Sequence, residues 1–245
     1  MDYRTYQLKC REWLACIGAG VLIAIAVSWL LYRSVYGMVL AVLFVPLCIN
    51  YWKQRALEKR KQELLLEFKD AMQSVAAALM AGYSMENAWR AAEQEIRELY
   101  GEASYFSVEL HQINEAVRMN QPIEKELMQF AERSGSEDIL SFAEVFQFAK
   151  RSGGDFAKIL QTAINRISDK LEVEREIATV IAGRKMEQKV MNVVPAFILF
   201  YLNSSSPDFL EPLYGNLFGV AVMSVALFIY LIAVKFAGRI TDIKV

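Results

Sequence analysis

Two long stretches that lack charge almost completely, one near each end of the sequence, constrain the fold of this chain more than any other feature. Residues 13–32 contain no charged side chain, and residues 217–236 contain only Lys235. A helix of about twenty residues extends about 30 Å, the thickness of the hydrocarbon core of a membrane. Each stretch therefore predicts a transmembrane helix.

The first stretch can also be interpreted as a secretory signal peptide, because it lies close to the N-terminus. A signal peptide has an apolar region of roughly 7 to 15 residues followed by a small-residue cleavage site. Residues 13–32 are longer than this and end in the bulky sequence WLLY. This pattern favours a membrane helix that is retained.

Two shorter apolar runs accompany the long ones. Residues 35–51 contain Pro46, which a membrane helix tolerates because neighbouring groups can satisfy the freed carbonyl. Residues 190–202 would extend only about 20 Å as a helix, so they predict either a short span or a re-entrant segment. We expect four transmembrane helices in two hairpins, within residues 1–52 and 190–245.

Basic residues indicate how these helices are oriented. They gather beside the predicted spans at Arg4, Lys9, Arg11, Lys53, Arg55, Lys59, Arg60, Lys61, Arg184, Lys185, Lys189, Lys235, Arg239 and Lys244. The links at residues 33–35 and 203–216 hold only Arg33. Because short flanks rich in lysine and arginine stay in the cytoplasm, both termini and residues 53–189 are predicted to be cytoplasmic.

The segment 53–189 is polar and has the period of amphipathic helices. Its apolar residues recur every three or four positions within residues 64–79, 85–96, 106–117, 123–131, 139–146 and 156–171. Gly82, Gly153 and Gly154 lie between these runs, where we expect turns that need the backbone freedom of glycine. Strand-like alternation is almost absent, so we predict an all-α chain with a cytoplasmic antiparallel six-helix bundle.

Few residues of this chain are suited to catalysis. His111 is the only histidine and lies outside the apolar stripe of its run, which indicates a solvated side chain. No phosphate-binding loop of the GxxxxGK[ST] type occurs, and the three cysteines lack metal-ligand spacing. The crowded carboxylates of Glu93, Glu95, Glu98 and Glu102 can attract a divalent cation, but a solvated acidic face is the better interpretation.

The charge balance excludes one further class of function. The net charge is −1, so the chain lacks the basic excess that marks a nucleic-acid binder. Together these observations predict no catalytic residue, no cofactor, no metal site and no nucleic-acid partner. We expect a protein that is not an enzyme.

Four blocks of the sequence stand at helix boundaries or links and carry a resemblance to a known family. They are AAALMAGYSMENA at 76–88, LMQFAERSGSED at 127–138, FAKRSGGDFAKIL at 148–160 and SPDFLEPLY at 206–214. In order and spacing, residues 65–245 resemble the type II secretion F domain, and within it the TadB branch, which serves tight-adherence (Flp-type) pilus assembly. One departure is Asn120, which stands where the family often has glycine.

The resemblance implies a platform protein of the bacterial cytoplasmic (inner) membrane. Its partners would be a TadA-like secretion ATPase that supplies the force, a TadC-like sister protein or a second copy of itself, the pilins and the membrane lipids. Exposed charged residues near the helix links are the expected contact residues: Arg133, Arg151, Asp155 and Arg184.

Two other functions stay open at the level of sequence. One is a polytopic membrane enzyme or small transporter that uses the helical segment as a regulatory domain. The absence of charged side chains deep inside the predicted spans disfavours a transport path. The other is a helical adaptor that is tethered to the membrane without using its spans.

Overall fold

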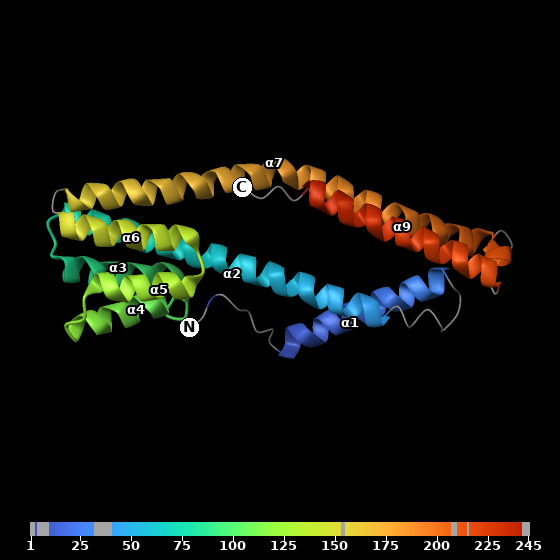
Figure 1. The fold of residues 1–245 in the computed structure, drawn as a ribbon, viewed down its shortest axis with the longest axis horizontal. Coiled ribbons are helices and arrows are strands. Elements are labelled where there is room, and N and C mark those ends of the chain that lie inside the picture. The colour runs from blue at the N-terminus through green and yellow to red at the C-terminus, as the bar shows by residue number, and fades with distance from the viewer. Residues whose placement is uncertain are drawn as a thin grey trace. The chain divides into compact units, whose positions relative to one another are not determined.

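The described part of the chain is helical throughout. The computed structural model describes Tyr3 and residues 10–31, 41–152, 155–206, 210–214 and 216–241. Its elements, drawn in Figure 1, are α1 (Cys10–Leu31), α2 (Ala41–Met80), α3 (Met85–Tyr100), α4 (Tyr105–Arg118), α5 (Ile123–Ser134), α6 (Glu137–Ser152), α7 (Phe156–Ser205), the 3₁₀ turn η2 (Glu211–Leu213) and α9 (Leu217–Thr241). No strand occurs among these residues, which confirms the all-α prediction.

The chain divides into two compact units. One, which we call the core unit, comprises Met1–Gln7 and Lys53–Glu172, and the other, the apolar unit, comprises Leu8–Trp52 and Val173–Val245. The core unit begins at the same residue as the predicted cytoplasmic segment 53–189, whereas residues 173–189 belong to the apolar unit. Helices α2 and α7 each run without a break from one unit into the other.

Aromatic side chains form the centre of the core unit. The rings of Phe68, Phe106 and Phe130 lie within 6.1 Å of one another, centroid to centroid, and all three side chains are fully buried. Residues from α2, α3, α4, α5, α6 and α7 all contribute to this one cluster. The apolar spacing in the sequence therefore marks the faces that these helices bury.

The turns of the core unit depend on a few residues with a positive φ angle. Gly82 has φ +88° and Gly135, at the end of α5, has φ 63°. Asn120 also lies in the left-handed region, with φ 62°, between α4 and α5. Glycine and asparagine are the residues that tolerate this conformation best, so Asn120 is suited to this turn. Gly153 and Gly154 lie outside the described residues.

The apolar unit contains close contacts between its own helices. In α1, a Cβ atom added to Gly20 would lie 3.1 Å from the Cα atom of Val45 in α2. The Tyr230 hydroxyl of α9 donates a hydrogen bond to the Asn192 carbonyl of α7, at 2.5 Å. Since Gly238 lies near Gln188 further along the same pair, α7 and α9 are antiparallel here.

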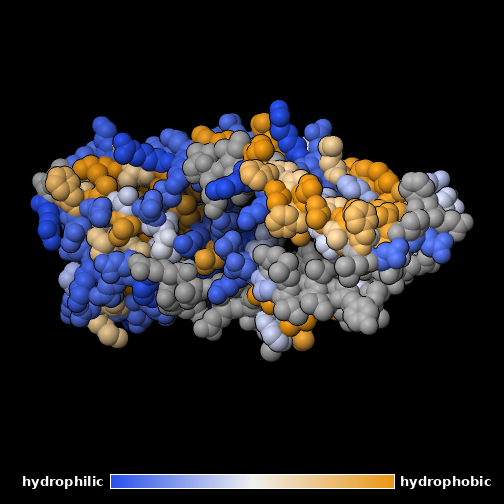
Figure 2. Space-filling model, turned by 45° about the vertical axis from the view of Figure 1, so that its right-hand side comes forward, coloured by the Kyte–Doolittle hydropathy of each residue, from blue (hydrophilic) through white to orange (hydrophobic). Residues whose placement is uncertain are grey.

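Many large apolar side chains of the apolar unit stay exposed. Phe218 is 80% exposed, and Phe197, Val225, Phe228, Ile229 and Phe236 are also exposed. Figure 2 shows orange and tan side chains gathered on the right-hand side of the view. Such a surface is unusual in a protein surrounded by water and is expected where the solvent is lipid.

Two described helices are long and apolar enough to cross a membrane. They contain Trp13–Leu31 of α1 and Phe218–Ile240 of α9, and coincide with the two long stretches in the sequence. Of the two shorter predicted spans, residues 35–51 fall partly outside the described residues, and residues 190–202 lie within α7. Four spans therefore stay a prediction.

Candidate functional site

The predicted contact residues lie in different surroundings. Arg151 is exposed in the last turn of α6. Asp155 precedes α7, and its Oδ1 accepts a hydrogen bond from the backbone N–H of Lys158 at 3.3 Å, so its carboxylate caps that helix. Arg184 is exposed in the part of α7 that belongs to the apolar unit. Three of the four predicted residues therefore belong to the core unit and one to the apolar unit, and their role as contact residues stays a prediction.

Arg133 is held by a buried acid of its own unit. Its Nη2 atom lies 2.8 Å from Oε2 of Glu109 in α4, and the Glu109 side chain is fully buried whereas that of Arg133 is 39% exposed. The Arg133 Nε atom also donates to the Gln129 carbonyl. A buried carboxylate needs such a partner, so this arginine stabilises the interior of the unit.

Tyr3 completes the same network from the start of the chain. Its ring is fully buried between those of Tyr105 and Phe130, with both centroid distances at 6.4 Å. Its hydroxyl lies 3.1 Å from Oε1 of Glu109, and its backbone N–H donates to the carbonyl of Arg133. Burial, followed by the negative charge of Glu109, raises the pKa of the Tyr3 hydroxyl, which therefore stays a donor.

A cation covers the outer side of this aromatic group. The guanidinium carbon of Arg60 in α2 lies 4.6 Å from the centre of the Tyr3 ring and 5.4 Å from that of Tyr105. An arginine in this position is attracted by the negative face of each ring. Tyr3 is thus fixed to the core unit through residues of α2, α4 and α5.

The sequence indicates this network at one kind of position, where a carboxylate takes the place of an apolar residue. Glu109 lies three residues after Phe106 and four before Ile113, so it falls on the apolar stripe of α4. A carboxylate at such a position has to be buried with a partner. Glu67 of α2 is a second case, because its buried Oε2 accepts the Phe106 N–H at 2.6 Å and so caps α4. Burial raises the pKa of Glu67.

The acidic cluster of α3 is dispersed over several neighbours. Glu93 receives hydrogen bonds from Asn114 and Arg97 and lies 2.7 Å from Nδ1 of His111, which is exposed. Glu95 instead accepts from Ser74, and Glu98 accepts from Gln94. Within the described residues, no group of three or more potential ligands is arranged to hold a metal ion.

A groove lies between α6 and α7 on the core unit. Its volume is about 440 Å³, and its apolar lining comes from Phe142, Val145, Ile159, Ala163 and Ile167. Asp138, Ser141, Thr162 and Arg166 supply the polar part of the lining. A groove of this size with a few polar groups is typical of a site that binds an apolar ligand in a fixed orientation.

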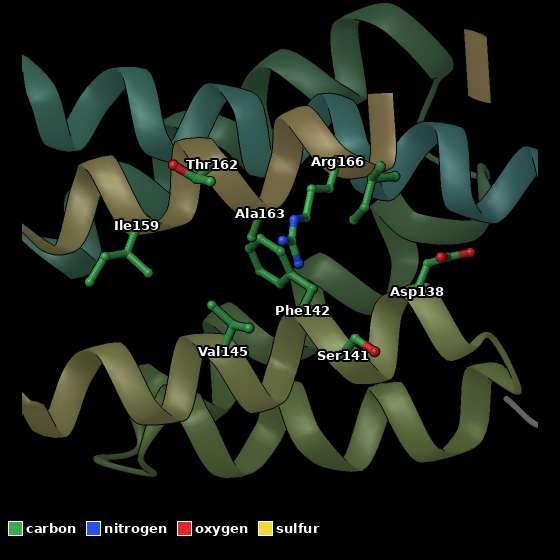
Figure 3. A pocket seen from close by; sticks show the side chains of 9 residues that line it. Asp138, Ser141, Phe142, Val145, Ile159, Thr162, Ala163 and Arg166 are labelled. Atoms are coloured by element: carbon green, nitrogen blue, oxygen red, sulfur yellow. The ribbon is translucent and has the colours of Figure 1, made fainter. Parts of the chain in front are cut away.

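Two cations of α7 border the groove and differ in their pairing. Lys170 lies 2.8 Å from Oδ2 of Asp138, so both charges are neutralised at one end. Arg166 forms no ion pair with any described residue. Figure 3 shows its side chain extending from α7 into the space between the helices, with the guanidinium beside Phe142. The groove therefore presents one unneutralised positive charge next to apolar walls.

No protein-family model, curated protein or solved structure matches this chain.

Proposed function

We propose that this chain is a membrane platform protein of a pilus-assembly or secretion machine, which transmits work from a cytoplasmic secretion ATPase to pilins in the membrane. The resemblance of residues 65–245 to the type II secretion F domain suggests the machine. The bacterial inner membrane and the TadB-like role are part of this proposal.

One observation supports it more than any other: α2 and α7 are each continuous from the core unit into the apolar unit. A helix resists bending over many turns because each residue adds a backbone hydrogen bond. A displacement of the core unit is therefore proposed to reach the apolar helices through two continuous helices.

Tyr3 supports the predicted orientation. Its burial in the core unit agrees with a topology in which Tyr3 and residues 53–172 lie on the same side of a membrane. If α1 crosses the membrane, the chain must cross back before Lys53. Residues 35–51 are the apolar run available for that return, in agreement with a first hairpin.

The contacts of α9 support a second hairpin. Tyr230 and Asn192 are hydrogen bonded, so the part of α7 that follows Gln188 lies alongside α9. If α9 spans the bilayer, this part of α7 occupies the same depth. The packed pair thus favours a short span at residues 190–202 over a re-entrant segment.

The function is tested with the full chain in lipid nanodiscs and the secretion ATPase of the same organism. We expect the protein to bind the ATPase and to raise its rate of ATP hydrolysis. A Gln54→Pro variant, which interrupts α2 between the units, should still bind but should abolish pilus assembly in cells, because proline breaks the helix. The matched Gln54→Ala variant should assemble pili normally.

The opposite results are equally informative. ATP hydrolysis that stays unchanged at saturating platform protein contradicts the proposed function. Topology is tested separately with a single cysteine at position 120 in a chain without Cys10, Cys16 and Cys48. An impermeant thiol reagent should label it only after the membrane is opened, and labelling in intact cells would reverse the orientation.

A further inference from the structure

We propose that the groove between α6 and α7 binds a helical segment of the secretion ATPase that carries apolar side chains and one carboxylate. This inference rests on the proposed function and adds the place and chemistry of the contact.

The dimensions of the groove suit a helix. Along α6 the lining runs from Asp138 to Val145, and Phe148, 70% exposed, continues the same stripe three residues later. Ten residues of helix cover about 15 Å, which matches about three turns of a partner helix. Recognition of this kind places apolar anchors of the partner at positions i, i+3 or i+4, and i+7.

The charge of the groove selects the polar residue of the ligand. Arg166 has no ion pair with any described residue, whereas Asp138 is already paired with Lys170. The Arg166 guanidinium, which is exposed, can bind a carboxylate by charge-assisted hydrogen bonds. The Ser141 and Thr162 hydroxyl groups lie in the same lining and can bind the backbone or polar edge of the partner.

A second copy of this chain fits the groove less well. A two-fold contact of groove against groove would bring two unpaired Arg166 side chains toward each other, which is repulsive. A contact of the groove with a different face of a second copy would be heterologous and would build a ring or an open filament of many copies. A partner helix that carries a carboxylate avoids both the repulsion between arginines and the assembly of many copies.

The test measures binding of the purified ATPase to the full chain in nanodiscs. Arg166→Glu should weaken binding at least about tenfold, the loss expected when a charge-assisted hydrogen bond is replaced by repulsion. Ser141→Trp, which fills the groove from an exposed position, should have a similar effect. The matched controls are Arg90→Glu on α3 and Gln129→Trp on α5, both at exposed positions outside the groove, and each should change affinity by less than about twofold.

Each outcome separates this inference from the proposed function. If the wild-type chain does not bind the ATPase, the proposed function fails. If the wild type binds and both groove variants bind equally well, the function stands and the groove is the wrong site. If Arg166→Glu changes the oligomeric mass of the chain but not ATPase binding, the groove joins two copies and this inference is overturned.

Discussion

The core unit and the apolar unit use the same residue types in opposite ways. Phe68, Phe106 and Phe130 are fully buried against one another, whereas Phe218 and Phe228 are 80% and 65% exposed. The first group gains stability by leaving water for a packed interior. The second group stays exposed in the fold itself. The comparison teaches that packing inside the chain stabilises the core unit, whereas the exposed rings of the apolar unit would gain stability only from the proposed contact with lipid.

The largest expected effect comes from removing a buried ring. Phe130→Ala deletes the side chain that contacts Phe68, Phe106 and Tyr3, so we expect the core unit to lose about 3–5 kcal/mol of unfolding free energy. Phe228→Ala should cost less than about 1 kcal/mol in nanodiscs, since lipid fills the space. Hydrogen exchange measured peptide by peptide distinguishes the units, and equal losses would mean that Phe228 is packed against protein.

The second prediction tests whether packing within the apolar unit, in addition to contact with lipid, stabilises this unit. A Cβ atom at Gly219 would lie 2.3 Å from the backbone oxygen of Leu213, whereas one at Gly18 meets nothing within 4 Å. Gly219→Ala should therefore destabilise the unit by about 2 kcal/mol through overpacking. Gly18→Ala should be neutral or slightly stabilising, because alanine favours the helix.

The two glycine variants are compared by thermal unfolding in nanodiscs. A Tm that falls for Gly219→Ala alone means that the link before α9 is packed closely against that helix. Equal Tm values for both variants would show that the link moves aside, and that internal packing adds little to the stability of the apolar unit.

A smaller effect is expected at the residue that joins the start of the chain to the core unit. Tyr3→Phe keeps the buried ring but removes the donor to Glu109, which should cost about 1 kcal/mol. Tyr201→Phe is the matched control, because Tyr201 is exposed in the apolar unit. Chemical denaturation followed by circular dichroism measures both, and equal midpoints would mean that Glu109 is satisfied without Tyr3.

The sequence predicts the helices well because they depend on local rules. Apolar spacing and breakers place the helices between Met85 and Ser152 within a few residues of their bounds, and Ser84 caps α3 as its position before that helix suggests, accepting the Asn87 N–H. These features are set by periodicity and by hydrogen bonding over one turn. The two long apolar stretches are likewise readable from length alone.

The polar network and the groove could not be predicted in the same way. Tyr3 and Glu109 are 106 residues apart, and nothing local indicates that they meet. The groove depends on which stripe of α6 faces α7, which is decided by the packing of the whole unit. Only Glu109 and Glu67 carried a signal, because the place of each carboxylate on an apolar stripe requires a buried partner.

The smallest expected effect on stability comes from a polar residue at the surface of the core unit, Glu93. Burial alone would raise the pKa of Glu93, but hydrogen bonds from Asn114 and His111 and the charges of His111 and Arg97 outweigh it and hold the pKa below its usual value of 4.5. A lowered pKa means that the ionised side chain stabilises the fold above the unfolded-state value. This contribution is lost as the pH falls through the folded-state value.

Glu93→Gln should therefore lower stability by less than about 1 kcal/mol at pH 6 and by progressively less as the pH falls below 4.5. The control Glu98→Gln removes an exposed acceptor of Gln94 and should change stability little at either pH. Urea midpoints at several pH values measure the difference. If the difference in stability between wild type and Glu93→Gln does not decrease in acid, the substitution destabilises the fold for a reason other than the lost charge, such as lost packing against Asn114. The helical stretches Trp13–Leu31 and Phe218–Ile240 should show no such dependence, because neither carries a carboxylate.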